Sequence, residues 1–239
     1  MLTGCIDPNN MSFTKLQDID TRKKHYLESI KYYLNETNLS ILFVENSGYD
    51  ISDSFVPEVN SGRLEILTFN GNNYNRLLGK GYGEMLILEY ASTFSNLFKT
   101  ADFIFKITGR YRVLNIQSYI NYYFINKNSF DILINFKPDL SFVDSRFWGA
   151  KSLFFTESLI KYKDIIDDSN SIHFEHALCK AVHDFINNGF IYSGLNHYPR
   201  YSGIYGTDGS RYNDSWLHWI VREILVKILN FIQKKIQIS

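Results

Sequence analysis

The sequence predicts an α/β protein with a mostly parallel β-sheet flanked by helices, followed by a C-terminal amphipathic helix. Short, continuous apolar runs alternate with helical segments through the first half of the chain, and parallel strands need crossover connections of that length. Apolar residues also recur at helical spacing near the end of the chain. Because such crossovers are right-handed, we expect helices on both faces of the sheet.

Four strands and two helices are expected in the first half. The strands are predicted at residues 2–6, 39–44, 64–69 and 103–107, and each run stops at polar or glycine residues. A helix capped by Asp20 or Thr21 carries apolar residues at helical spacing and ends near residue 34. The second helix begins at Gly79 and runs toward Phe98.

The second half has a less regular pattern. Two helices are expected before a loop rich in glycine and tyrosine, the second with an apolar face between Phe174 and Phe185. The other elements are an aromatic segment at residues 119–124, strands at 131–136 and 140–143, an apolar run at 190–192 and a final helix at about 214–235. Three interpretations of the apolar face of this last helix stay open: packing against the core, contact with a membrane surface, and a dimer interface.

Polar clusters follow the predicted strands of the first half. They lie at residues 7–10, 45–48, 70–73 and 108–110. Ligands of parallel α/β sheets bind at the carboxyl ends of the strands. We therefore expect these clusters to converge on one crevice, although they are spread over about a hundred residues of sequence.

The composition excludes several classes of protein. The 25 basic residues balance 25 acidic residues, so no broad electrostatic field attracts nucleic acid. Hydrophobic residues make up 45% of the chain, which excludes intrinsic disorder. Two cysteines in 239 residues are no disulfide framework, and no run is apolar enough to span a membrane. We expect a cytoplasmic protein, with peripheral contact to the inner face of the membrane as an open alternative.

Five segments, in order along the chain, carry a resemblance to a known group. They are ILFVENSGYD at residues 41–50, GKGYGE at 79–84, ADFIFKITGR at 101–110, FWGAK at 147–151 and FEHAL at 174–178. Their order resembles that of the GT-A nucleotide-sugar glycosyltransferases, particularly the small bacterial enzymes that build capsule and lipopolysaccharide. The resemblance covers roughly residues 2–185, and no single segment is specific by itself.

The resemblance implies transfer of a sugar from a nucleotide-sugar donor to a glycan or lipid-linked acceptor, with inversion. It divides the chain into a donor-binding half at 1–112, an acceptor-binding half of the same domain at 113–211 and the helix at 212–239. The donor contacts that it implies are Thr3, Gly4, Glu45, Asn46 and Ser47 around the nucleoside, and Lys80, Gly81, Tyr82, Gly83, Lys106, Thr108 and Gly109 toward the diphosphate. The glycine-containing loop at 79–83 can equally be an ordinary tight turn before a helix.

The chain departs from the family where the family has Asp-x-Asp, the pair of carboxylates that holds a divalent cation. Thr108, Gly109 and Arg110 stand there instead. A guanidinium can also neutralise the charge that grows on a leaving diphosphate. We therefore expect Arg110 to act in catalysis without a metal or other cofactor. A rival metal site would use Asp144 and His197, and a solvated Arg110 is the ordinary alternative.

Glu175 is the candidate general base, because the resemblance places it in an acidic element at the start of a helix and an inverting transfer needs a carboxylate near the acceptor hydroxyl. An ordinary acidic residue favoured by the helix dipole is the alternative. The candidates for holding the donor sugar or the acceptor are Asp144, Arg146, His197 and Arg211. The histidines at 173, 176 and 183 lack the spacing of a zinc motif and are expected to be solvated or capping residues.

Two other functions stay open. A nucleotidyltransferase of similar fold would need carboxylates for Mg²⁺, and a protein that binds a glycan or a partner without catalysis would have lost the Asp-x-Asp pair. Hydrolysis of the nucleotide-sugar donor would distinguish an enzyme from a protein that binds without catalysis.

Overall fold

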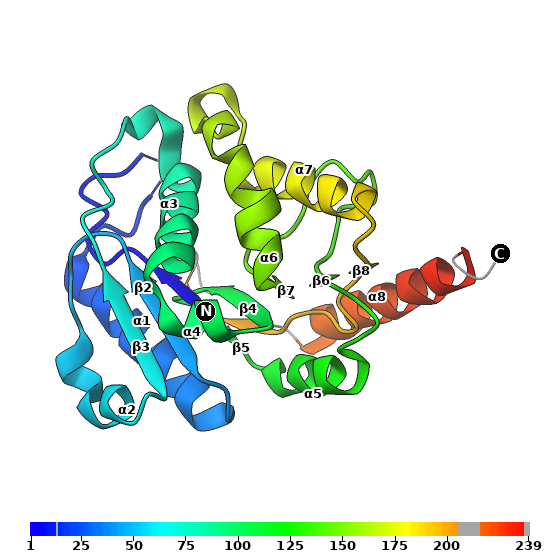
Figure 1. The fold of residues 1–239 in the computed structure, drawn as a ribbon, viewed down its shortest axis with the longest axis horizontal. Coiled ribbons are helices and arrows are strands. Elements are labelled where there is room, and N and C mark those ends of the chain that lie inside the picture. Colours follow the sequence, from blue (N-terminus) through cyan, green and yellow to red (C-terminus); the bar gives the residue numbers. More distant parts are fainter. Residues whose placement is uncertain (13, 205–215, 237–239) are drawn as a thin grey trace.

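A computed structural model describes residues 1–12, 14–204 and 216–236, without the side chains of 218 and 229–236. Its centre is a seven-stranded sheet in the order β3-β2-β1-β4-β7-β6-β8 (Figure 1). The strands are β1 Leu2–Gly4, β2 Ile41–Glu45, β3 Leu64–Thr68, β4 Phe103–Thr108, β6 Ile132–Leu133, β7 Phe147–Lys151 and β8 Tyr192–Ser193. β5 Arg112–Val113 and β9 Tyr201–Ser202 form a separate antiparallel pair.

The sheet is mostly parallel, as predicted. β1 pairs in parallel with β2 and β4, β2 pairs in parallel with β3, and β6 pairs in parallel with β8. β7 is antiparallel to both of its neighbours, β4 and β6. The carboxyl ends of β1, β2, β3 and β4 therefore meet at one edge of the sheet.

Helices cover both faces of the sheet (Figure 1). They are α1 Ile19–Glu36, α2 Val56–Asn60, α3 Gly79–Phe94, α4 Asn96–Thr100, α5 Ile116–Asn126, α6 Ser152–Phe154, α7 Phe174–Asn187 and α8 Trp216–Ile236. Short turns of other helix types lie at η1 Ser52–Phe55, η2 Arg76–Leu78, η3 Phe155–Leu159, η4 Ile160–Ile165 and η5 Asp168–Asn170. The predicted α/β class is confirmed.

Strand alternation divides the interior into two cores. Leu42 and Val44 of β2 pack with α3, α4, α6 and α7, whereas Ile41 and Phe43 pack with α1, η1 and α5. Neighbouring residues of a strand point to opposite faces. A continuous apolar run is thus required wherever both faces are covered, which is why the first-half strands were readable from the sequence.

Two predicted helices have different ends in the structure, and the aromatic segment, for which no type of element was predicted, is helical. α1 is capped by Asp18, whose side chain accepts from the backbone N–H of Thr21, so the predicted caps lie inside the helix. The helix from Gly79 stops at Phe94, since Ser95 caps the separate α4 by accepting from the N–H of Phe98. The aromatic segment at 119–124 belongs to helix α5.

The predicted strand at residues 140–143 is wrong. Leu140 has a left-handed φ of 58°, and Val143 makes only an isolated bridge with Phe136. The strand of this region that enters the sheet is β7, which is the FWGAK segment that the family resemblance implies to be an acceptor-side strand, and its Gly149 lets the rings of Phe103 and Phe105 lie against the backbone. A Cβ on Gly149 would lie 2.5 Å from the Phe103 ring.

The predicted donor-binding region, 1–112, supplies β1 to β4, and the region 113–211 supplies β6, β7 and β8. That division stays a prediction. No helix within the described residues is both long and apolar enough to cross a membrane. Residues 216–236 form the expected C-terminal helix, α8, and it projects from the body of the protein (Figure 1).

Candidate functional site

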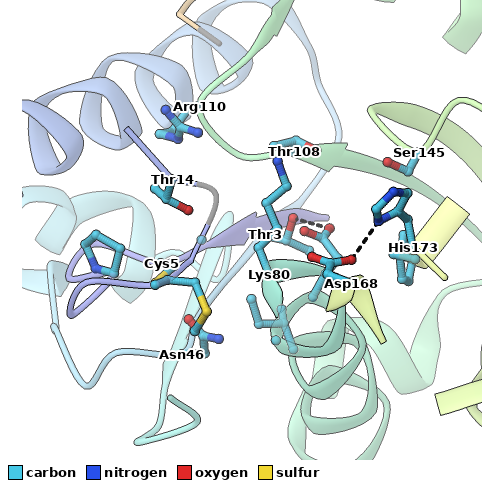
Figure 2. Close-up of a pocket in the computed structure, with 18 of the residues that line it drawn as sticks. Thr3, Cys5, Thr14, Asn46, Lys80, Thr108, Arg110, Ser145, Asp168 and His173 are labelled. Carbon is cyan, nitrogen blue, oxygen red and sulfur yellow. Dashed lines mark hydrogen bonds and ion pairs between the residues drawn. The ribbon is translucent and has the colours of Figure 1, made fainter. Parts of the chain in front are cut away.

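A cavity of about 830 Å³ lies at the carboxyl ends of the parallel strands (Figure 2). Each of the four polar clusters expected to converge there supplies a lining residue, namely Pro8, Asn46, Asn72 and Arg110. Thr3 and Gly4 of β1 and Thr108 of β4 complete the strand side of the cavity. Segments far apart in the sequence thus form one site, as the strand pattern predicted.

Two helix N-termini meet beside this cavity. Lys80, Gly81 and Gly83 of the first turns of α3 line it, and so do Phe174 and Glu175 of the first turn of α7. A Cβ on Gly81 would lie only 3.0 Å from the backbone nitrogen of Phe174. Both helices direct unsatisfied N–H groups and the positive ends of their dipoles to this region, which favours an anionic ligand.

Arg110 has a buried cationic group that lacks a partner among the described residues. The residue is 8% exposed and lines the cavity, and its Nη1 donates to no oxygen of the described residues. Burial, with the nearby Arg110 guanidinium as the next cause, lowers the pKa of His25. A buried guanidinium without an anion is costly. The cavity therefore presents a donor and a positive charge that a bound anion would satisfy.

Asn46 presents an unpaired acceptor to the same cavity. It is 2% exposed, and its Oδ1 has no hydrogen-bond partner in the described part of the chain. Asn46 also lines an adjacent polar cavity of about 370 Å³, together with Asp7, Asn9 and Asn72. An acceptor in this place suits a ligand with hydroxyl or amino groups.

Lys106 is fully buried and does not line the cavity. Its ammonium forms an ion pair with Glu84 of α3 and donates to the backbone oxygen of Ser145 at 2.9 Å. Glu84 also accepts from Thr3 Oγ1 at 2.8 Å (Figure 2). The role of Glu84 was not predicted from the sequence, although a lysine in an otherwise apolar buried strand requires a carboxylate partner.

Glu175 lines the cavity from the first turn of α7. Ser145 Oγ donates to Glu175 Oε1 at 2.7 Å. This bond orients the carboxylate and leaves Oε2 for a ligand. Since Lys106 holds the backbone of Ser145, the buried ion pair and the candidate base are connected through one residue.

A second acid–base pair in the cavity wall was not expected from the sequence. His173 Nδ1 lies 2.8 Å from Asp168 Oδ1, and both residues line the cavity (Figure 2). The Asp168 side chain is 7% exposed and the His173 side chain 45% exposed. Gly79 makes room for the carboxylate, because a Cβ there would lie 1.8 Å from Asp168 Oδ2. Asp168 comes from η5, a short turn without any pattern in the sequence.

Other residues expected at the donor do not line the cavity. Glu45 is fully buried, and its carboxylate accepts from the backbone N–H groups of Ile6, Ser47 and Tyr49 and from Thr68 Oγ1. It therefore ties β1, β2 and β3 together at the sheet edge. Ser47 lines the smaller polar cavity, Tyr82 packs against the ring of Tyr74, and Gly109 lies against the backbone of Thr3.

The residues expected at the sugar or acceptor are only partly brought together. Arg146 lines the cavity, where its Nε donates to Asp144 at 2.8 Å and its guanidinium lies over the Tyr201 ring. His197 instead pairs with Glu223 of α8 at 2.6 Å. Arg211 lies outside the described residues. Asp144 and His197 thus each have another partner, and the described side chains contain no group of three or more His, Cys, Asp or Glu residues placed to hold a metal.

Cys5 lines the cavity but is not a candidate nucleophile. Burial raises the pKa of its thiol, which keeps it protonated near neutral pH. The site therefore offers cationic, hydrogen-bonding and acid–base groups rather than a covalent nucleophile of this kind.

The comparisons with known proteins give a fold-level likeness alone. No protein-family model and no curated protein matches the chain. Among solved structures, one crystal structure from Desulfovibrio desulfuricans, described as a proposed nucleotide-diphospho-sugar transferase, aligns over 81% of this chain and 78% of its own. The identity is 9% and the TM-score 0.41. A likeness of this size carries no argument about activity, and the architecture rests on the strand order of the chain itself.

The buried Glu45 carboxylate is expected to stabilise the sheet edge. Glu45→Gln replaces one charged acceptor oxygen by a donor amide beside N–H groups that need acceptors, and it should lower the free energy of unfolding by about 2–3 kcal/mol. Urea denaturation measures the change. Glu36→Gln, at an exposed position near the end of α1, should leave the midpoint almost unchanged. Equal midpoints for wild type and Glu45→Gln would contradict this structural role.

Proposed function

We propose that the protein is a nucleotide-sugar glycosyltransferase that moves a sugar from a nucleotide-sugar donor to a glycan or lipid-linked acceptor. One observation carries the proposal: the buried Arg110 guanidinium, unpaired among the described residues, faces a cavity at the carboxyl ends of parallel strands. Cavities at this place in α/β sheets bind nucleotides and related ligands. The cavity volume of about 830 Å³ is in the range of small-molecule sites.

The diphosphate of the donor is assigned to the cationic side of the cavity. Arg110 supplies a charged donor, Lys80 a second cation, and the N-termini of α3 and α7 supply N–H groups. Thr3, Gly4 and Asn46 are assigned to the nucleoside, with the Asn46 Oδ1 acceptor directed to a hydroxyl or amino group. Positive charge placed before reaction stabilises a leaving diphosphate without further reorganisation.

The residues at the end of β4 do not fit a divalent cation. Thr108, Gly109 and Arg110 provide one hydroxyl, no side chain and a positive charge, whereas Mg²⁺ and Mn²⁺ select carboxylate oxygens. The carboxylate of Glu84, which accepts from Thr3 of the neighbouring strand, is already paired with Lys106. We therefore derive no step through a metal and assign the charge compensation to Arg110.

Glu175 is assigned as the general base. Its Oε2 would accept the proton of the acceptor hydroxyl while the acceptor oxygen attacks the anomeric carbon, and the nucleoside diphosphate would leave from the opposite side. This geometry inverts the anomeric configuration. Arg146, with Asp144 as its partner, is assigned to the sugar or the acceptor. A role in capsule or lipopolysaccharide synthesis, on the cytoplasmic side of the membrane, is the setting that we infer from the family resemblance.

A nucleotidyltransferase is the second candidate function, since it uses a similar fold and a similar cavity. It would need carboxylates that bind Mg²⁺. The Arg110 and chelation measurements below separate it from a glycosyltransferase, and donor hydrolysis separates both from a protein that binds without catalysis.

Arg110→Ala should lower turnover by at least about 10²-fold, because it removes a cation placed at the developing charge. Arg110→Lys should restore it only in part, since an ammonium lacks the two-pronged geometry of a guanidinium. Wild-type activity should survive EDTA. The matched control is Arg112→Ala, two residues away and outside the cavity lining, which should turn over normally. Loss of activity in EDTA with recovery in Mn²⁺ would show that the proposal of metal-free transfer is wrong.

Glu175→Gln should leave donor affinity nearly intact while turnover falls about 10² to 10⁴-fold, because the amide keeps the shape but cannot take a proton. Steady-state kinetics measures the turnover, and titration with the nucleotide-sugar donor measures the donor affinity. Glu157→Gln, at an exposed position of η3, is the control and should behave as wild type. Near-normal turnover of Glu175→Gln would remove Glu175 from the mechanism.

We also propose that α8 lies on a membrane surface near a lipid-linked acceptor. Several of its apolar side chains are exposed, including Leu217, Ile224 and Leu225, while Lys227 is a nearby cation. Wild-type protein should float with anionic liposomes, and Ile224→Glu should lose most of this binding, whereas Val56→Glu on α2 should not. Absence of flotation in wild type, with a stable dimer by light scattering, would favour the dimer face instead.

A further inference from the structure

The Asp168–His173 pair has no role in the proposed reaction, although it is built into the cavity wall. Asp168 is more than nine-tenths buried and has its hydrogen bond to His173 Nδ1. Because Nδ1 is occupied, Nε2 is the ring nitrogen left for a ligand, and no described residue bonds to it. The ring belongs to the residue that caps α7, so the helix fixes its backbone.

The surroundings of His173 favour a bound anion. The pair lies where the N-termini of α3 and α7 abut, with Asp168 against Gly79 and Gly81 against Phe174. The charged or titratable side chains that share this wall are Lys80, Glu84, Glu175 and Tyr74, whose hydroxyl donates to the Gly79 carbonyl, and His176 lies behind with its ring 5.6 Å from that of His173. Glu84 is neutralised by Lys106, and Glu175 accepts from Ser145. The helix N-termini and Lys80 are the positive groups that an anion at His173 Nε2 would meet, whereas the Asp168 carboxylate bonds to Nδ1 on the other side of the ring and Glu175 keeps its negative charge.

We propose that His173, in its imidazolium form held by Asp168, donates a hydrogen bond from Nε2 to the departing phosphate oxygen of the donor. This inference rests on the proposed glycosyltransferase function. A carboxylate on one side of an imidazole stabilises its protonated form, and an anion on the other side adds to that effect. His173 then supplies, in addition to Arg110 and Lys80, a third positive group of the protein's own at the leaving diphosphate.

The step balances without any other reactant. The bond between the anomeric carbon and the phosphate oxygen breaks with its electron pair on the phosphate. The acceptor oxygen forms the new bond to that carbon, and its proton passes to Glu175. His173 keeps its proton throughout and stabilises the charge on the departing oxygen. Asp168 acts as a positioning residue, because it fixes the ring orientation and the protonated form.

Proton NMR titration of the histidines tests this directly, with inorganic pyrophosphate as the probe. Saturating pyrophosphate should move the His173 titration midpoint upward by about one pH unit, since a contacting anion favours the imidazolium. Asp168→Asn should reduce this response to pyrophosphate, because the carboxylate that fixes the orientation of the ring is lost. His183, which contacts the Leu140 carbonyl away from the cavity, is the internal control and should not respond.

The pH profile of turnover supplies the second readout. If the imidazolium is essential, turnover of the wild-type protein should decrease as pH rises, which gives the pH profile an alkaline limb. His173→Gln should have a lower turnover, and its profile should lack that alkaline limb. Asp168→Asn should move the limb to lower pH. The half-exposed His173 side chain makes His173→Gln the variant that tests the idea where Asp168→Asn fails to fold.

The outcomes distinguish this inference from the function on which it rests. Pyrophosphate that binds through Arg110 but leaves the His173 midpoint unchanged would overturn the role of His173 and leave the glycosyltransferase proposal intact. Absence of any pyrophosphate binding would overturn both.

Discussion

The buried ammonium of Lys106 is the constraint on which the site depends. It lies on β4 with no exposed surface and bonds to Glu84 of α3 and to the backbone of Ser145 ahead of β7. A buried charge that loses a partner typically costs about 3–5 kcal/mol, so these three segments are held in one arrangement. Ser145 then orients Glu175, and Glu84 orients Thr3. One ion pair in the core thus fixes groups on both sides of the cavity.

This arrangement also determines which charges a ligand meets. The Glu84 carboxylate is paired with Lys106, whereas the Arg110 guanidinium has no described counter-ion. Acid–base groups lie at the start of α7 and in η5, each oriented by a neighbour. The cavity therefore has a positive part suited to phosphates and a wall suited to proton transfer. A chain that transfers a sugar without a metal would need both.

The sequence predicted the first half of the fold well, because strands covered on two faces must be continuously apolar and their ends must be polar. It located β2 and β3 to within two residues and foresaw that distant loops would meet. It was wrong about a strand at residues 140–143, where Leu140 has a left-handed backbone, whereas the family resemblance implied the strand at 147–151 that forms β7. Asp168 and His173 could not be paired in advance, because their contact depends on η5 lying against Gly79. The Glu45 carboxylate was expected to meet a ligand, yet it bonds to its own turn and to two neighbouring segments.

The central claim is that Arg110 holds the diphosphate of a nucleotide ligand without the help of a metal. Isothermal titration with UDP, GDP, CDP and TDP in EDTA tests it most directly, on wild type and on Arg110→Gln. The account predicts that at least one nucleoside diphosphate binds the wild-type protein in EDTA and that Arg110→Gln weakens binding about tenfold or more, the effect of losing one charged hydrogen bond. Equal affinity for the two proteins, or binding that appears only when Mn²⁺ is added, would contradict it.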